Sequence, residues 1–181
     1  MTTYLALLRG INVSGQNLMP MAKLQQSLSG LGFEKIKTYL QSGNVIFDAK
    51  KSAETSLAEV ITNRIKQDFG YDVPVLVLTH AALTKIAHAN PLWPTVGGDE
   101  KLFHCTFLFQ AVTPQTFQSL TLPAAEGERA VLVGQTVLLH CPHGYGKTKL
   151  NNNYFERTLK VPATTRNWRT VLQLQVLGAE P

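Results

Sequence analysis

Residues 140–149, HCPHGYGKTK, contain the Gly-Lys-Thr triplet that ends a phosphate-binding loop. The complete motif is Gly-x-x-x-x-Gly-Lys-Ser/Thr, because its first glycine lets backbone N–H groups wrap around the phosphates. Cys141 stands where that glycine belongs, and no apolar run ending in aspartate follows. The sequence therefore argues against an NTPase. It leaves Lys147 and Lys149 as cations of a turn that could attract an anion, with Thr148 as the expected cap of a following helix.

A local excess of positive charge extends from this turn towards the C-terminus. Six basic residues stand between positions 147 and 169, against the single acid Glu156. In TTRNWRTV, Arg166 and Arg169 fall in the first turn of an expected helix, where cations oppose the helix dipole unless an anion lies nearby. We expect Arg166, Asn167 and Arg169 to contact an anionic partner. The alternatives are an internal salt bridge and a solvated basic face.

The segment RGINVSGQN follows an apolar, strand-like stretch and precedes an expected helix. Free N–H groups at a helix start bind anions, and glycines allow a ligand to approach closely. Arg9, Asn12, Gln16 and Asn17 could supply donors. Alternatively, Asn, Gly and Ser only form the turn. The spacing of a Gly-x-Gly-x-x-Gly fingerprint is absent, so the sequence implies no dinucleotide and no other cofactor.

The segment TYLQSGNVIF has the composition of a tight hairpin with polar residues around its turn. Strand alternation would place Tyr39 and Gln41 on one face and Leu40 on the other. Tyr39 could stack on a nucleic-acid base, with Ser42 and Asn44 as polar contacts, but the aromatic pattern of an RNA-recognition module is missing. Turn formation and core packing are the alternative interpretation.

Metal and nucleophile chemistry have weaker support. His104 and His140 could meet across neighbouring strands, with His143 close by, but no third ligand has standard zinc spacing, so we predict no metal site. Cys105 and Cys141 alternate with bulky apolar residues, which predicts inert thiols in the core. The chain has no Gly-x-Ser-x-Gly elbow and no pair of acids placed for acid/base catalysis.

The elements that must position these residues begin with a β-α-β-β-α-β order that closes near residue 79. Its first helix starts at Pro20 and carries Met21, Leu24, Leu28 and Leu31 at helical spacing. Its second helix has Ser52 as the expected cap and Gly70 as the stop. We expect one face of this helix to carry Leu57, Val60, Ile61 and Ile65.

The second half repeats this order only in part. A helix and a Pro/Gly-rich loop over residues 80–100 lead to a strand, a short helix, a hairpin around Gly134 and a helix ended by Pro162. The last segment, TTRNWRTVLQLQVLG, is expected to be a helix capped by a threonine, so the order becomes β-α-β-β-α-α. The sequence thus predicts an α+β fold of two ferredoxin-like subdomains, 1–79 and 101–181, joined by 80–100 and packed as one compact unit.

Composition agrees with an ordered globular protein. The 181 residues are 44% hydrophobic and 16% charged, with a net charge of +5. The chain has no run of about 18 apolar residues and no basic, cleavable N-terminal leader, so we expect a cytoplasmic protein without a membrane partner.

Four blocks, RGINVSGQNLMPM, TYLQSGNVIF, HGYGKTKL and TTRNWRTVLQL, resemble the bacterial family called domain of unknown function 1697. The resemblance implies two ferredoxin-like subdomains and no particular activity. The family usually has a serine where this chain has Thr148, so a hydroxyl is retained. The residues at family-like positions are mostly polar and favour a shared site: Arg9, Gly10, Asn12, Gly15, Asn17, Gln41, Ser42, Gly43, Asn44, Gly146, Lys149, Arg166, Asn167 and Trp168.

We therefore expect these four segments to form a site for a nucleotide or a nucleic-acid phosphate. Its expected ligand-binding residues are Arg9, Asn12, Asn17, Gln41, Ser42, Asn44, Lys147, Lys149, Arg166, Asn167 and Arg169. One alternative is a small-molecule enzyme in which Lys149 or Tyr39 acts as an acid or base. The other is a structural or partner-binding module in which these residues only fix turns.

Overall fold

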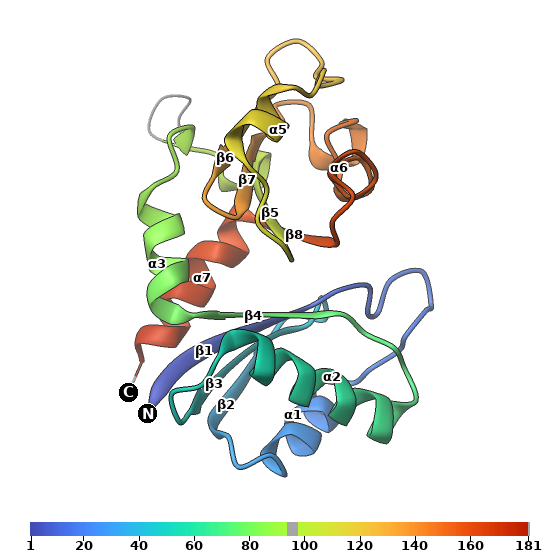
Figure 1. Ribbon diagram of the computed structural model, residues 1–181, viewed down its shortest axis with the longest axis vertical. Helices are drawn as coiled ribbons and strands as arrows, with labels where there is room; N and C mark the ends of the chain where they lie inside the picture. Colours follow the sequence, from blue (N-terminus) through green and yellow to red (C-terminus); the bar gives the residue numbers. More distant parts are fainter. Residues whose placement is uncertain (94–97, 181) are drawn as a thin grey trace. The chain divides into compact units, whose positions relative to one another are not determined.

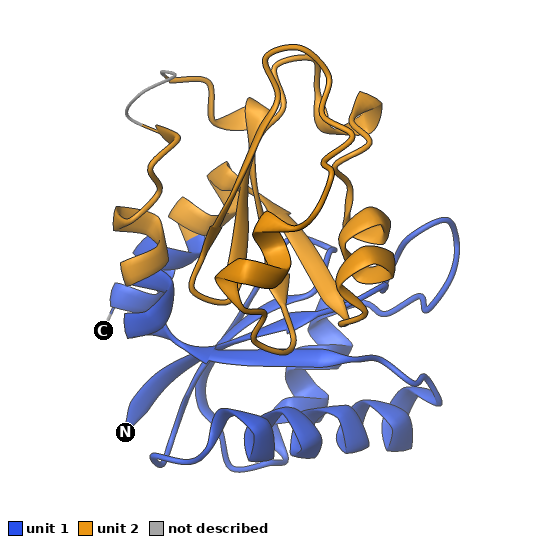
Figure 2. Ribbon diagram, turned by 45° about the horizontal axis from the view of Figure 1, so that its top comes forward, with its two compact units in different colours: residues 1–84, 174–181 blue, residues 85–173 orange. Residues whose placement is uncertain are grey.

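The computed structural model describes residues 1–93 and 98–180 and divides the chain into two compact units (Figure 2). Unit 1 consists of residues 1–84 and 174–181, and unit 2 consists of residues 85–173. Residues 174–181 therefore belong to unit 1, whereas we expected all of 101–181 to form the second subdomain. The loop expected before residue 100 includes 94–97, which lie outside the described residues. Among the described helices, none has the length and apolar character needed to cross a membrane.

Unit 1 has the predicted β-α-β-β-α-β order. Its elements are β1 (Thr2–Leu8), α1 (Met21–Ser29), β2 (Glu34–Tyr39), β3 (Asn44–Ala49), α2 (Glu54–Phe69) and β4 (Val75–Thr79). The strands form an antiparallel sheet in the order β2-β3-β1-β4, with β1 paired to both β3 and β4. Figure 1 shows α1 and α2 on the same face of this sheet. This is the ferredoxin-like arrangement that the sequence predicted.

The core of unit 1 lies between that face and the two helices. Tyr4, Ala6 and Leu8 alternate along β1 and pack in one cluster with α1 and α2. Helix α2 buries Leu57, Ile61 and Ile65, which follow helical spacing. Val60 was also expected on this face, but it is 44% exposed because it lies one residue round the helix from Ile61.

The ends of α2 were predicted correctly only at the C-terminus. Gly70 ends the helix in the left-handed conformation, with φ of 76°, and its N–H donates to Lys66. Ser52 is not the cap, because the helix begins at Glu54 and Ala53 occupies the capping position. The Ser52 hydroxyl instead donates to the carbonyl oxygen of Lys50, 3.0 Å away.

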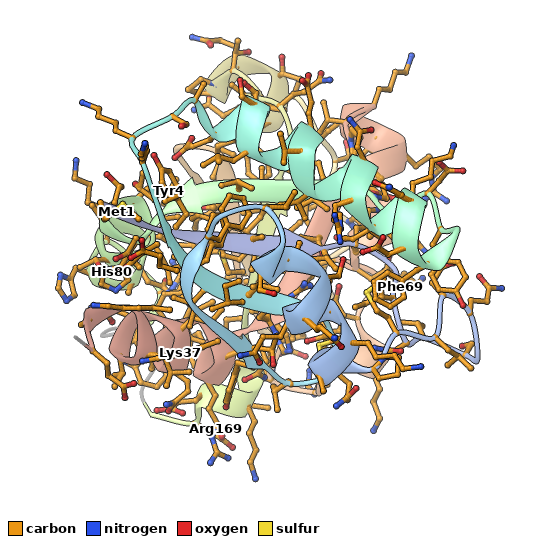
Figure 3. The ribbon with its side chains drawn as sticks, turned by 90° about the horizontal axis from the view of Figure 1, so that it is seen from below. Met1, Tyr4, Lys37, Phe69, His80 and Arg169 are labelled. Atoms are coloured by element: carbon orange, nitrogen blue, oxygen red, sulfur yellow. The ribbon has the colours of Figure 1, made fainter. Side chains whose placement is uncertain are left out.

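Two further helices extend across the division between the units: α3 (His80–His88) and α7 (Trp168–Ala179). Their parts within unit 1 are in contact. His80 Nε2 lies 2.7 Å from the carbonyl oxygen of Gln175, and Gly178 lies so close to the His80 ring that a Cβ atom there would collide with it. Lys37 of β2, which Figure 3 labels, forms a 2.7 Å ion pair with Glu180 near the end of the chain.

Unit 2 repeats the topology completely. Two single-turn 3-10 helices, η1 (Glu100–Leu102) and η2 (Tyr145–Lys147), accompany β5 (Phe103–Leu108), α5 (Pro114–Gln118), β6 (Arg129–Val133), β7 (Thr136–His140), α6 (Asn152–Leu159) and β8 (Ala163–Asn167). The antiparallel sheet has the order β6-β7-β5-β8. The expectation of a helix in place of the last strand was wrong. TTRN is part of β8, which pairs with β5 from Ala163 opposite Leu108 to Asn167 opposite His104.

The helix-covered face of this second sheet holds the core of unit 2. Leu108, Leu139 and Ala163 share a cluster with Phe117 of α5 and Phe155 of α6. Helix α6 is amphipathic, since Tyr154, Phe155 and Leu159 are buried whereas Asn153 and Arg157 are exposed. The outward face of α6 is therefore polar.

Candidate functional site

In unit 1, the loop after β1 is held by its own asparagines. Asn12 Oδ1 accepts a hydrogen bond from the Met19 N–H at 2.7 Å. Asn12 Nδ2 donates to the carbonyl oxygens of Met19, at 3.0 Å, and Gln41, at 2.8 Å. Asn17 Nδ2 donates to the Gly10 carbonyl oxygen at 2.9 Å. Both amide side chains thus bind backbone groups of the loop, and Asn12 also binds the neighbouring hairpin. This arrangement favours a turn-forming role for them.

The β2–β3 hairpin is held in the same way. Asn44 is buried, and its Nδ2 donates to the Tyr39 carbonyl oxygen at 2.7 Å and to Ser42 Oγ at 3.0 Å. Strand β2 ends at Tyr39, and Leu40 has a left-handed φ of 60°, so the expected alternation does not continue to Gln41. Gln41 and Ser42 are exposed, and Arg9 is half-buried.

The GKTK turn of unit 2 differs from a phosphate-binding loop. Residues Tyr145–Lys147 form the 3-10 turn, and Thr148 is extended, with its hydroxyl accepting from the Leu150 N–H at 3.0 Å. Thr148 is therefore not the helix cap that the sequence predicted. Helix α6 is capped by Asn151, whose side chain accepts from the Tyr154 N–H at 2.9 Å.

Lys149 lies beside a concave surface that we call the α6 pocket. Its volume is about 380 Å³, and its lining residues are Thr121, Pro123, Thr148, Lys149, Asn151, Asn153, Tyr154 and Arg157. Asn153 and Arg157 are four residues apart on α6 and so project from the same side of the helix. None of the described residues that line the pocket is acidic, whereas Lys149 and Arg157 are both exposed cations.

This arrangement is suited to an anion. Two cations and several side-chain donors line one concavity, and the helix N-terminus beside it carries partial positive charge. Of the residues that the sequence predicted to bind an anion, Lys149 lines this pocket; Arg157, which also lines it, was not among them. The four-residue spacing of Asn153 and Arg157 on an expected helix was the available signal. For Thr121 and Pro123 the sequence contained no such signal, because only the folded chain brings them next to α6.

Arg166 does not line the α6 pocket. It lies in β8 opposite Cys105, on the sheet face away from Leu108 and Ala163, and only 6% of its surface is exposed. Its Nη1 donates to Thr164 Oγ1 at 2.8 Å and to the Thr165 carbonyl oxygen at 3.1 Å. Burial lowers the pKa of this guanidinium to about 10. Arg166 was expected in a helix turn, and the strand pairing overturns that expectation.

Asn167 and Arg169 form the start of α7. Asn167 Oδ1 accepts from the Arg169 N–H at 2.9 Å, so this asparagine, not a threonine, caps the helix. Asn167 Nδ2 lies 3.3 Å from the Lys101 carbonyl oxygen. Arg169 is exposed in the first turn, as predicted, and Lys147 is exposed in the 3-10 turn; neither lines the α6 pocket. Trp168 is fully buried and belongs to the core.

The histidines do not form a cluster. His140 lies opposite Phe103 and His104 opposite Leu139, so their side chains project from opposite faces of the sheet. His104 stacks on Tyr145, with ring centroids 4.5 Å apart, and burial lowers its pKa to about 4. Within the described residues, no three His, Cys, Asp or Glu side chains are placed to hold a metal ion.

The two cysteines are buried, as predicted, and neither forms a disulfide. Burial raises the pKa of the Cys105 thiol far above its usual range. Burial and the nearby Glu128 raise the pKa of Cys141 to about 11. Both sulfurs are therefore protonated near neutral pH and are poor nucleophiles, which confirms their interpretation as core thiols.

A second concavity, of about 530 Å³, lies in unit 1 between α1 and α2 and includes Lys23, Ser27, Arg64 and Asp68 in its lining. Asp68 Oδ2 accepts from Ser27 Oγ at 2.6 Å and from Arg64 Nε at 2.7 Å. These two hydrogen bonds hold the pKa of Asp68 below its usual range, and the bond from Ser27 has the larger effect. The group therefore links the two helices, and the α6 pocket is the better candidate for a ligand.

A solved structure supports the fold. The chain resembles the conserved bacterial protein SP0830 from Streptococcus pneumoniae, with a TM-score of 0.71, 24% sequence identity and 98% of each chain covered. No curated protein is significantly similar in sequence. A model of the family described as "Protein of unknown function (DUF1697)" matches residues 1–138. This range includes RGINVSGQNLMPM and TYLQSGNVIF and ends before HGYGKTKL and TTRNWRTVLQL. The chain thus belongs to the DUF1697 family of proteins of unknown function.

Proposed function

We propose that this protein binds a phosphate-bearing ligand in the α6 pocket of unit 2. The single observation that carries the proposal is the placement of Lys149 and Arg157 on one concavity whose described lining contains no acid. An anion bound in this concavity would be attracted by both cations. Lys149 supplies a compact charge, and the Arg157 guanidinium supplies a planar fork that matches two phosphate oxygens.

The remaining lining residues support the same chemistry. The side-chain amides of Asn151 and Asn153 can donate hydrogen bonds, and the side chains of Tyr154 and Pro123 contribute carbon surface. A pocket of about 380 Å³ also lies at the lower end of the range of roughly 300–1,000 Å³ usual for small-molecule sites. Each part of a compact phosphorylated ligand would therefore have a suitable surface to contact.

Titration with inorganic phosphate, followed through the backbone amide NMR signals, tests this proposal. We expect saturable shifts concentrated at residues 121–123 and 148–157. Arg157→Gln removes one charge-assisted contact, so it should weaken phosphate binding by about tenfold. Arg157 is exposed, so this substitution should leave the fold intact.

Lys147→Gln is the matched control, because Lys147 is an exposed cation of the same turn that does not line the α6 pocket. It should leave phosphate binding nearly unchanged. The absence of saturable shifts in the parent protein would refute the proposal. So would an equal loss of affinity in Lys147→Gln and Arg157→Gln, since that result would mean diffuse attraction to a basic surface.

A further inference from the structure

We infer that the α6 pocket selects the terminal phosphate of a small phosphomonoester over the phosphodiester backbone of a nucleic acid. This inference rests on the proposed function and specifies its ligand class. Three features of the described residues lead to it: the number of cations at the pocket, the positions of the other cations between residues 147 and 169, and the burial of the aromatic side chains.

The charge of the pocket matches a dianion. Lys149 and Arg157 line it together, and no described acid in its lining offsets them. A phosphomonoester carries a charge of about −1.5 to −2 at neutral pH, because its second pKa is about 6. A backbone phosphodiester carries a single negative charge per phosphate. Two cations around one concavity therefore interact more strongly with the monoester than with one diester unit.

The other cations of the basic run are not gathered at this pocket. Lys147, Lys160 and Arg169 are exposed but do not line it, and Arg166 is buried in β8. A protein that follows a nucleic-acid strand typically presents a continuous basic groove to successive phosphates. The described lining of the α6 pocket offers two cations for one phosphate group.

The aromatic residues give independent support. Proteins that bind single strands stack bases on accessible aromatic rings. All Phe, Tyr and Trp residues of this chain fall within the described residues, and each is buried or half-buried. Tyr39, which the sequence offered as a stacking platform, is half-buried, and Tyr154 at the α6 pocket is buried. The described chain therefore presents no fully exposed aromatic ring on which a base could stack, whereas it does present a concavity of about 380 Å³.

Binding of methyl phosphate, dimethyl phosphate and oligothymidylate to the full chain tests the inference, with inorganic phosphate as the reference ligand. We expect methyl phosphate to bind at least about tenfold more tightly than dimethyl phosphate, a difference of 1.4 kcal/mol. Its affinity should fall from about pH 7.5 to about pH 5.5, as the second phosphate ionisation is lost. No described histidine or carboxylate lines the pocket to add a titration of its own in that range.

Arg157→Gln should reduce methyl phosphate binding, whereas Lys147→Gln should not. If inorganic phosphate binds but dimethyl phosphate or oligothymidylate binds as tightly as methyl phosphate, the ligand class is overturned while the proposed function survives. If inorganic phosphate does not bind at all, both are overturned.

Discussion

Asn12 Nδ2 donates a hydrogen bond to the carbonyl oxygen of Gln41, 2.8 Å away, and so joins the loop after β1 to the β2–β3 hairpin. The same side chain also bonds to both the N–H and the carbonyl oxygen of Met19. Three hydrogen bonds made by one amide side chain stabilise a loop that has left-handed residues at positions 12, 14 and 17. In unit 1, the side chains of Asn12, Asn17 and Asn44 therefore brace the turns that contain them.

Asn12→Ala should therefore destabilise the protein, although the Asn12 side chain is only half-buried. It leaves the Met19 N–H and two carbonyl oxygens without their partner, at a cost of about 1–3 kcal/mol. Urea unfolding measures this loss. Gln41→Ala is the control, since Gln41 takes part in this contact through its backbone oxygen alone, and we expect less than about 0.5 kcal/mol for it. Equal stability of Asn12→Ala and the parent would show that the loop does not depend on this side chain.

Gly43→Ala should be more harmful than Gly15→Ala. Both glycines have a left-handed φ, of 83° and 74° respectively, so each substitution carries a backbone penalty of about 1–2 kcal/mol. A Cβ on Gly43 would also lie 2.7 Å from both Leu8 Cβ and Ile11 Cδ1, whereas one on Gly15 has no atom within 4 Å. Overpacking adds about 1–3 kcal/mol. Comparing the unfolding midpoints isolates the steric contribution, which would be absent if the two variants were equally stable.

The two thiols should be unreactive in the folded protein. Cys105 and Cys141 are buried with raised pKa values, so a disulfide reagent such as Ellman's should modify them only after unfolding. The release of coloured thiolate should be slow in buffer and rapid in concentrated urea. Rapid modification of either cysteine in buffer would mean that its strand opens readily or that its burial is incomplete.

His104 should make the protein less stable in acid. Its folded pKa of about 4 lies below the ordinary value of 6.5, so between these two pH values the unfolded state binds more protons. The contribution of neutral His104 to the free energy of unfolding is therefore fully present above pH 6.5. It is lost as the pH falls towards 4, by at most about 1.4 kcal/mol per pH unit. His104→Phe retains a ring next to Tyr145 without the titration. Urea unfolding across this range should show a smaller pH slope for the variant; equal slopes would assign the acid sensitivity elsewhere.

The elements of unit 1 could be predicted because their signals are local. Met21, Leu24 and Leu28 recur at helical spacing and are all buried in α1, and Gly70 ends α2 by adopting a conformation that glycine allows. Such patterns need only neighbouring residues to be interpreted. The starts of helices were harder to predict. Ser52 has a side chain suited to capping, yet it stands one position before the residue that occupies the cap, Ala53.

Strand β8 could not be predicted because its stability comes from a distant strand. Thr164 and Thr165 favour a strand, but the residues after them follow a helical pattern, and only pairing with β5 decides where the strand ends. As a result, Arg166 was expected in the first turn of a helix, whereas it occupies a buried position in β8. The candidate site shifted accordingly, from the arginines of RNWR to Lys149 and Arg157, because the described pocket forms where α6 meets the 121–123 segment.

The central claim, that the α6 pocket binds phosphate, is tested most directly by calorimetric titration of inorganic phosphate into Arg157→Glu and Arg169→Glu. Both substitutions reverse an exposed charge and change the net charge equally, but only Arg157 lines the pocket. We predict that Arg157→Glu abolishes measurable phosphate binding while Arg169→Glu retains affinity within about threefold of the parent, a difference below 1 kcal/mol. Equal weakening in both variants, or undiminished binding in Arg157→Glu, would contradict the assignment of the site.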